Sequence, residues 1–243
     1  MNIKLIFLAF IFLVLNACDR NKEIMKYQVT KVDKIPEMNA DWDKAPWRDI
    51  APLYLSEFMG DKPEHFPQTQ AKIAYDDSAI YVIFRVEDQY VKAIHDKNQD
   101  PVYKDSCVEF FFTPEEDSNE GYFNLEMNCG GTMLFHHQKK PGISSKHISA
   151  PHMDRIEIAH SLPKIVNPEI EKRTTWEVEY RIPFSVLTDY HQFSLPKQGT
   201  MWRANLYKCA DDTSHPHWLT WAPVDHPKPN FHLPGFFGWL DFE

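Results

Sequence analysis

The sequence predicts an all-β protein whose single domain is an antiparallel, jelly-roll-like β-sandwich. Short runs of alternating apolar and polar residues recur along the chain, and turn-forming residues bound each run. No stretch has the length and apolar period of a long amphipathic helix. The chain has 243 residues, of which 43% are hydrophobic and 14% aromatic, which permits one large β domain.

The N-terminal segment resembles a bacterial export signal. A short basic stretch, residues 1–4, precedes an apolar run at 5–15 that is shorter than the roughly 20 residues needed to span a bilayer. The next residues, Leu15-Asn16-Ala17-Cys18, resemble a lipobox. This implies cleavage before Cys18, a lipid anchor on its thiol, and a location in the bacterial cell envelope, on the periplasmic or the cell-surface face. An ordinary signal peptide followed by an unrelated cysteine is the alternative.

Three segments follow from this interpretation. Residues 1–17 are predicted to be a lipoprotein signal peptide, residues 18–30 a flexible tether, and residues 31–243 the β-sandwich. Residues 51–70 contain three prolines and no clean period, so we expect a loop that covers the sheet.

With 35 acidic and 26 basic residues the chain has a formal net charge of −9, which disfavours nucleic acid as a partner.

Strands are predicted in quick succession from residue 71 onward. The first two, at 71–75 and 79–87, flank the turn formers Asp76-Asp77-Ser78 and should form a hairpin. The remaining elements are strands at 105–113, 122–129, 132–137, 174–182, 201–209, 218–221 and 236–242, a weaker strand candidate within 154–160, and a short helical turn at 183–187.

The strand at 105–113 carries the first functional clue. Its alternation places Ser106, Val108, Phe110 and Phe112 on the core side. The opposite face then holds Glu109 among mostly apolar neighbours, where a carboxylate must be either solvated in a groove or paired.

Polar side chains in other predicted strands extend this face. Asn124 and Glu126 lie in the next strand, and Arg203 and Asn205 lie in a third. If these strands are neighbours, they present a carboxylate, amides and a guanidinium together with Glu109. A sugar needs such a mixture because each hydroxyl both donates and accepts hydrogen bonds. This pattern favours carbohydrate binding.

Four stretches in order carry a resemblance to a known family: ADWDKAPW, AKIAYDDSAIYVIFRVED, YKDSCVEFFF and PNFHLPGFFGWLDF. From about residue 32 to the C-terminus the chain resembles carbohydrate-binding module family 9, in the form found in exported proteins of Bacteroidota. The resemblance implies a non-catalytic β-sandwich that clamps a sugar between two aromatic rings. It also implies a glycan ligand, a role in polysaccharide catabolism, and work beside other glycan-utilisation proteins.

The resemblance assigns site residues one by one. Tyr103 corresponds to the first clamp aromatic, Phe231 to the second, Glu109 to the strand carboxylate, and Asn205 to the strand amide. Characterised members have Trp at both clamps. His232, beside Phe231, is a candidate hydrogen-bond donor to a bound hydroxyl.

Two further departures concern polar residues. Asn124 stands where the family places an Arg, and Arg203 is the candidate that would replace that Arg from a neighbouring strand. The strand motif also has one extra residue, Cys107. No metal or cofactor is predicted, although the family can hold structural calcium. Asp76-Asp77 and Asp211-Asp212 are more simply turn formers.

Cys107, Cys129 and Cys209 are predicted to be buried small hydrophobes, since no two of them are spaced like metal ligands. Structural roles remain as alternatives to sugar binding. Glu109 could form an ion pair with Arg203, and the rings of Tyr103 and Phe231 could be packed within loops for stability.

Two other classes of protein remain as alternatives. A glycoside hydrolase would use Glu109 and Glu126 as paired carboxylates across the sugar. An electron-transfer sandwich would bind haem b, with Met127 and His136 as axial ligands.

Overall fold

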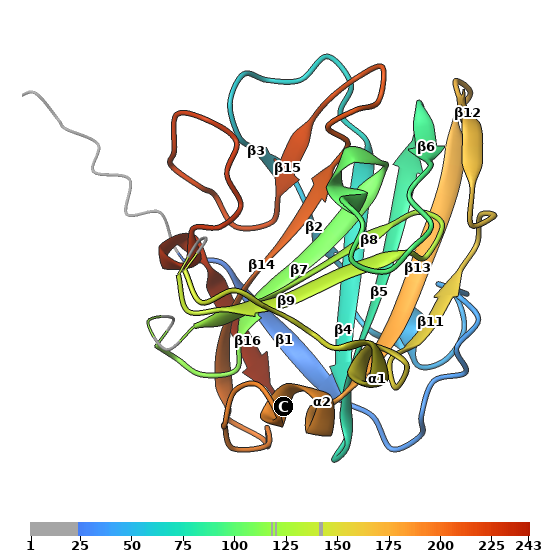
Figure 1. Cartoon of the computed structure of the whole chain (residues 1–243). Helices are drawn as coiled ribbons and strands as arrows, with labels where there is room; N and C mark the ends of the chain where they lie inside the picture. The colour runs from blue at the N-terminus through green and yellow to red at the C-terminus, as the bar shows by residue number, and fades with distance from the viewer. Residues whose placement is uncertain (1–23, 118, 120, 141–142) are drawn as a thin grey trace, which may run out of the picture.

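The strands of the computed structural model form two stacked layers, and those of one layer cross those of the other in the view of Figure 1. The structure describes residues 24–117, 119, 121–140 and 143–243. The signal peptide and Cys18 therefore lie outside the described residues. Within the described part of the chain, no helix has both the length and the apolar character to cross a membrane.

Sixteen strands and two short α-helices occur among the described residues. The strands are β1 (Lys26–Lys31), β2 (Leu53–Tyr54), β3 (Glu57–Phe58), β4 (Gln68–Tyr75), β5 (Ala79–Asp88), β6 (Val91–Ala93), β7 (Cys107–Thr113), β8 (Tyr122–Asn128), β9 (Met133–Gln138), β10 (Lys146–His147), β11 (Glu157–His160), β12 (Val166–Ile170), β13 (Thr174–Pro183), β14 (Met201–Cys209), β15 (Trp218–Thr220) and β16 (Gly238–Phe242). The helices are α1 (Ala150–Met153), α2 (Phe184–Thr188) and the 3₁₀ turns η1 (Trp47–Asp49), η2 (Val102–Lys104) and η4 (Pro234–Phe236).

Strand β1 joins the two layers. The first layer has the order β10-β9-β8-β7-β14-β16, and the second has β4-β5-β13-β11. The first part of β1 pairs in parallel with β16, and its last two residues pair in parallel with β4. The predicted β-sandwich is confirmed, but its strand pairing is not wholly antiparallel. The tether prediction is wrong for residues 26–30, because β1 already belongs to the sheet there.

The predicted strands are found close to their expected bounds. Asp76 closes the β4–β5 hairpin, since its carboxylate accepts hydrogen bonds from the backbone N–H groups of Ser78 (2.7 Å) and Ala79 (2.8 Å). The expected covering loop at 51–70 instead contains β2, β3 and the start of β4. The short β2 pairs with β4 and β3 pairs with β15, so these residues find partners at the sheet edges.

The two faces of β7 serve different parts of the molecule, as the alternation predicts. Val108, Phe110 and Phe112 are buried in the main core between the layers. Cys107 and Phe111 face the other way, into a second apolar cluster that includes Tyr207 of β14. Loops cover this outer face, and the candidate site lies among them.

A buried ion pair joins the layers inside the main core. Lys208 of β14 places Nζ 3.6 Å from Asp88 Oδ2, at the end of β5, and 2.7 Å from His217 Nε2. Trp176 Nε1 also donates to Asp88 (3.2 Å), and His65 Nε2 lies 2.7 Å from its other oxygen. Burial alone would raise the pKa of Asp88, but Lys208 and His65 outweigh it and lower this pKa to about 2.

Removing the amine should leave that carboxylate buried without its cation. We expect Lys208→Met to lower the free energy of unfolding by about 3 kcal/mol or more, as for other broken buried pairs. The measurement is urea denaturation. Lys31→Met is the matched control, because Lys31 pairs with Asp77 at the surface and its loss should barely move the midpoint. A Lys208→Met protein as stable as the unsubstituted chain would contradict this role.

Candidate functional site

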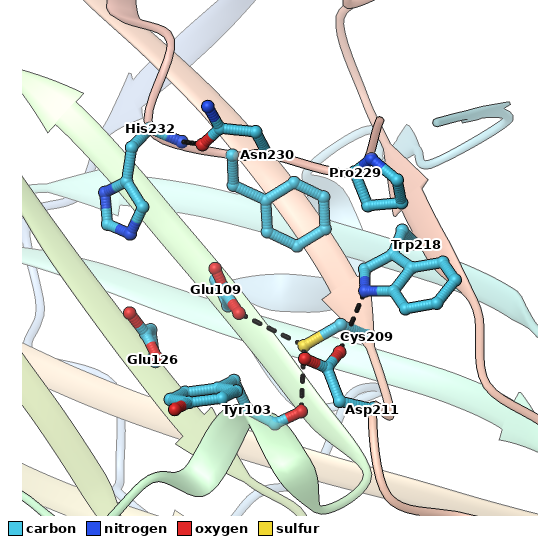
Figure 2. Close-up of a pocket in the computed structure, with 10 residues that line it drawn as sticks. Tyr103, Glu109, Glu126, Cys209, Asp211, Trp218, Pro229, Asn230 and His232 are labelled. Atoms are coloured by element: carbon cyan, nitrogen blue, oxygen red, sulfur yellow. Dashed lines mark hydrogen bonds between the residues drawn. The ribbon is translucent and has the colours of Figure 1, made fainter. Parts of the chain in front are cut away.

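A cavity of about 240 Å³ opens on the outer face of the first layer. Its floor comes from β7, β8 and the end of β14. In Figure 2, Tyr103 of η2 lies on one side and the segment Pro229–His232 on the other, with Glu109 between them. The lining residues are Tyr103, Glu109, Glu126, Cys209, Asp211, Trp218, Pro229, Asn230, Phe231 and His232.

Two carboxyl groups lie side by side on the floor. Glu109 of β7 is directly paired with Glu126 of β8, so their side chains leave the sheet on the same face. They are 2% and 5% exposed, and neither forms an ion pair within the described residues. Burial raises the pKa of Glu126 to about 8, and burial with the nearby Cys209 and Glu126 raises the pKa of Glu109 well above its usual value.

A chain of hydrogen bonds holds Glu126 in place. The Asn124 amide donates to Glu126 Oε1 (3.0 Å), and its oxygen accepts from Gln138 Nε2 (2.7 Å). Gln138 also lies 3.3 Å from His232 Nδ1, which is 2.8 Å from the hydroxyl of Tyr122. Burial lowers the pKa of His232 to about 4, so its imidazole is neutral near pH 7. The second oxygen of Glu126 has no hydrogen-bond partner among the residues that the structure describes.

Aromatic rings form the walls, and they differ in how much of each ring is free. Tyr103 is 37% exposed, and its carbonyl is held by the backbone N–H of Asp211 (3.2 Å). Trp218 is half-buried and donates its indole N–H to Asp211 (2.8 Å). Phe231 is buried and stacks on Tyr207 at 4.1 Å between ring centroids, so one face of that ring is already covered.

The structure brings four of the seven predicted binding residues into this cavity: Tyr103, Glu109, Phe231 and His232. Asn124 does not line the cavity, but it lies beside Glu126 on β8 and positions it by a hydrogen bond. Tyr103 does not plug a loop, because its ring is exposed, whereas Phe231 is also part of the packing.

Arg203 and Asn205 lie away from the cavity. Arg203 donates to the carbonyl of Phe237 and lies over the ring of Trp239 (4.5 Å). It forms no ion pair with Glu109 and does not line the cavity, so the prediction that it replaces the missing family Arg is wrong. Asn205 is fully buried, and its side chain bonds both the N–H (2.8 Å) and the C=O (3.0 Å) of Ala222. It fastens the segment after β15 to β14.

Six lining residues were absent from the predicted binding residues: Glu126, Cys209, Asp211, Trp218, Pro229 and Asn230. Glu126 shares the alternation of Asn124, so the sequence held a signal for it. Cys209 and Asp211 lie at the cavity because β14 pairs with β7. No local sequence pattern predicts that pairing. Trp218 starts a predicted strand, where an aromatic residue is more often part of the core.

The haem alternative fails on geometry. Met127 of β8 is buried in the main core between the layers. His136 of β9 is paired with Asn124, whose side chain is on the outer face with Glu126. Met127 and His136 therefore leave opposite faces of the sheet and cannot ligate one iron from its two sides.

The fold and the cavity define a class of protein: a curled β-sandwich with a small cavity, lined by carboxyl groups and aromatic rings, on the outer face of one sheet. The chain belongs to carbohydrate-binding family 9, whose sequence profile matches residues 34–242. The comparison with curated proteins gives no match.

Solved structures of similar fold come from two bacteria. A candidate carbohydrate-binding protein from Bacteroides uniformis ATCC 8492 has a TM-score of 0.79 and 28% identity, over 91% of this chain and 100% of that one. A family 9 module from Caldicellulosiruptor kristjanssonii in complex with glucose has a TM-score of 0.60 and 15% identity, over 90% and 96%. A complex of such a module with cellotriose has a TM-score of 0.58 and 15% identity, over 90% and 94%.

The raised pKa of Glu126 makes stability depend on pH. The folded chain holds this proton up to about pH 8, whereas the unfolded chain releases it near the ordinary value of 4.5. The folded state thus binds more protons between these values, and stability falls as pH rises through that window. We expect Glu126→Gln to flatten the fall in the free energy of unfolding between about pH 5 and pH 8.

Chemical denaturation at several pH values measures this slope. Glu87→Gln is the control, because Glu87 is exposed on β5 and its replacement should leave the slope unchanged. An identical slope in Glu126→Gln and the unsubstituted chain would show that the Glu126 proton is not held by the fold.

Proposed function

We propose that the cavity binds one sugar residue of a glycan, without catalysis. The observation that carries this is the pairing of two carboxyl groups on the floor with aromatic rings at the walls. Carboxyl oxygens hydrogen-bond sugar hydroxyls, and rings such as Tyr103 cover the C–H face of the sugar.

The size of the cavity supports the same proposal. At about 240 Å³ it is smaller than the roughly 300–1,000 Å³ of pockets for drug-sized ligands, which suits a single sugar ring. A neighbouring cavity of about 550 Å³ shares Trp218 and Pro229 with it, so a longer glycan has room to continue. The ligands of the Caldicellulosiruptor modules, glucose and cellotriose, are of this chemical class.

The carboxyl pair is arranged for binding more than for hydrolysis. A glycosidase places its two carboxyls on opposite sides of the scissile bond, with one of them ionised as nucleophile or base. Glu109 and Glu126 leave the same floor from adjacent strands, and burial raises the pKa of both. Glycoside hydrolysis is the competing function, and the release of reducing sugars from mixed polysaccharides would reveal it.

The Tyr103 ring gives the first test. Its backbone is held while its ring is exposed, so Tyr103→Ala should leave the melting temperature unchanged. We expect this change to weaken binding by about 30-fold, which corresponds to roughly 2 kcal/mol for an anchor residue. Tyr103→Trp should bind at least as well as Tyr. The measurement is calorimetric titration with cellotriose and with the oligosaccharide ranked first on a glycan array.

Tyr54→Ala is the matched control, because Tyr54 is 56% exposed on β2 and away from the cavity. Phe231→Ala should weaken binding and also lower the melting temperature, since Phe231 stacks on Tyr207. Normal binding by Tyr103→Ala would place the sugar elsewhere.

We also propose that the module is exported, anchored through a lipid on Cys18, and serves polysaccharide catabolism in the cell envelope beside other glycan-utilisation proteins. The lipobox-like segment 15–18 supports the anchor. Cys18→Ser should abolish acylation and leave the protein unprocessed or periplasmic. Palmitate labelling and membrane fractionation measure this, and unchanged labelling in the variant would rule out the anchor.

A further inference from the structure

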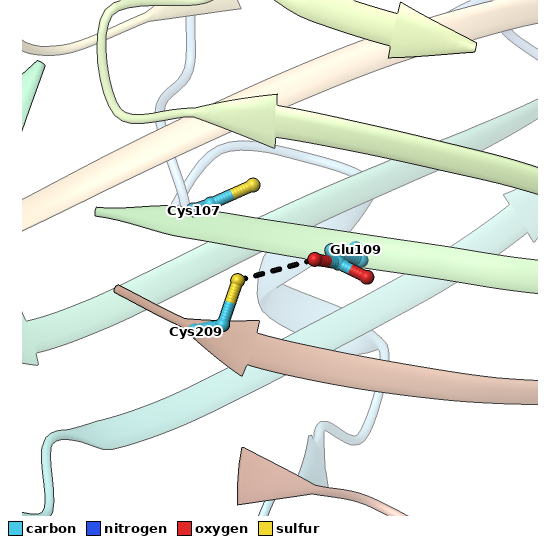
Figure 3. A group of neighbouring side chains, drawn as sticks. All are labelled: Cys107, Glu109 and Cys209. Atoms are coloured by element: carbon cyan, nitrogen blue, oxygen red, sulfur yellow. Dashed lines mark hydrogen bonds between the residues drawn. The ribbon is translucent and has the colours of Figure 1, made fainter. Parts of the chain in front are cut away.

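Two thiols and a carboxylate converge beside the floor of the cavity, which Glu109 and Cys209 line while Cys107 is buried next to them. The Sγ atoms of Cys107 and Cys209 and a carboxylate oxygen of Glu109 all lie within 4.8 Å of one another. Figure 3 shows the three side chains on β7 and the end of β14. Among the described residues, this is the one group of three or more such side chains whose potential ligand atoms are this close.

Strand register explains the convergence. Cys107 is directly opposite Cys209 in the antiparallel β7–β14 pair, and side chains at such positions have Cβ atoms roughly 4.5–5.5 Å apart. Glu109 is two residues after Cys107, so it leaves the same face of β7. Two of the three groups are already in contact, because the Cys209 thiol donates a hydrogen bond to Glu109 Oε1 at 3.1 Å.

The surroundings favour a cation. Glu109, Glu126 and Asp211 line the cavity, and none of its described lining residues is a Lys or an Arg. Glu126 is 5% exposed, and within the described part of the chain its Oε2 has no hydrogen-bond partner. This second carboxylate faces the same cavity as Glu109, with which it is paired across the strands. Together these groups offer a cation two sulfur ligands and two carboxylate ligands.

We infer that Cys107, Cys209 and Glu109 form a binding site for a thiophilic divalent cation of the Zn²⁺ type. Two sulfurs and an oxygen supply three of the four positions that Zn²⁺ prefers, and the cavity leaves the fourth open to Glu126, water or a ligand. Thiolates select such borderline ions over Ca²⁺ and Mg²⁺, which take oxygen ligands. Binding releases the two thiol protons and the proton held on the Glu109 carboxyl to solvent, and no electron is transferred.

The proposed cation site does not rest on sugar binding, because all three ligand atoms come from the protein, but it shares Glu109 with the proposed sugar site. A bound ion would occupy the Glu109 carboxylate. Glu109 would then be less available to accept hydrogen bonds from a sugar than in the metal-free protein.

Cobalt(II) is the probe, since its thiolate complexes absorb by sulfur-to-metal charge transfer. The purified full chain, reduced with a phosphine and freed of metal, should bind one equivalent of Co²⁺ with this absorption, and Zn²⁺ should bleach it. Cys107→Ala and Cys209→Ala should each lose the band. Cys129→Ala is the matched control, because Cys129 is also free and buried but lies in the main core, and it should keep the band.

A measurement on the unsubstituted chain covers the case in which an alanine variant does not fold. X-ray absorption of the Zn²⁺-loaded protein should show two sulfur neighbours at about 2.3 Å with oxygen neighbours completing the shell. The site would be refuted by Co²⁺ binding without the charge-transfer band, by a band that survives both cysteine changes, or by a zinc shell without sulfur.

Discussion

The candidate site depends on one unusual constraint: two carboxyl groups, Glu109 and Glu126, are buried side by side, and no Lys or Arg among the described residues pairs with either. Such a pair costs free energy when both members ionise, and the fold offsets this by holding protons on them. The hydrogen bonds through Asn124 keep Glu126 in place while one of its oxygens stays unpartnered. A floor of this kind offers both donors and acceptors to a ligand, which is what a polyhydroxylated molecule requires.

The two faces of one strand pair explain how the sandwich can carry that floor. On the inner face of β14, Lys208 pairs with Asp88 of β5 and ties the layers together. On its outer face, Cys209 reaches Glu109, while Asn205 fastens the segment after β15. The inner face therefore supplies rigidity, and the outer face positions groups that are poorly satisfied within the protein itself. Sites for ligands are often built in this way, on a rigid sheet with loops as walls.

Local alternation predicted the strands well, since each buried face repeats every second residue and turn formers mark the ends. It also placed Glu109 and Glu126 on outward faces. What the sequence could not supply is register. Cys107 and Cys209 are 102 positions apart in the chain. Only the β7–β14 pairing places them opposite one another. The same lack of register made Arg203 look like a partner of Glu109, although Glu109 is paired with Tyr207 and Arg203 with Thr113. The resemblance predicts Phe231 as a clamp aromatic, but it does not predict that this ring stacks on Tyr207, because that contact joins a loop to a strand.

The central claim is that a sugar residue occupies the cavity between Tyr103 and the segment 229–232. The most direct measurement is a crystal structure of the protein with the tightest-binding oligosaccharide. The account predicts one sugar ring in this cavity, with hydroxyls bonded to Glu109 or Glu126 and a C–H face against Tyr103. A sugar found instead in the larger polar cavity of about 490 Å³, beside His65 and Arg173, would contradict it.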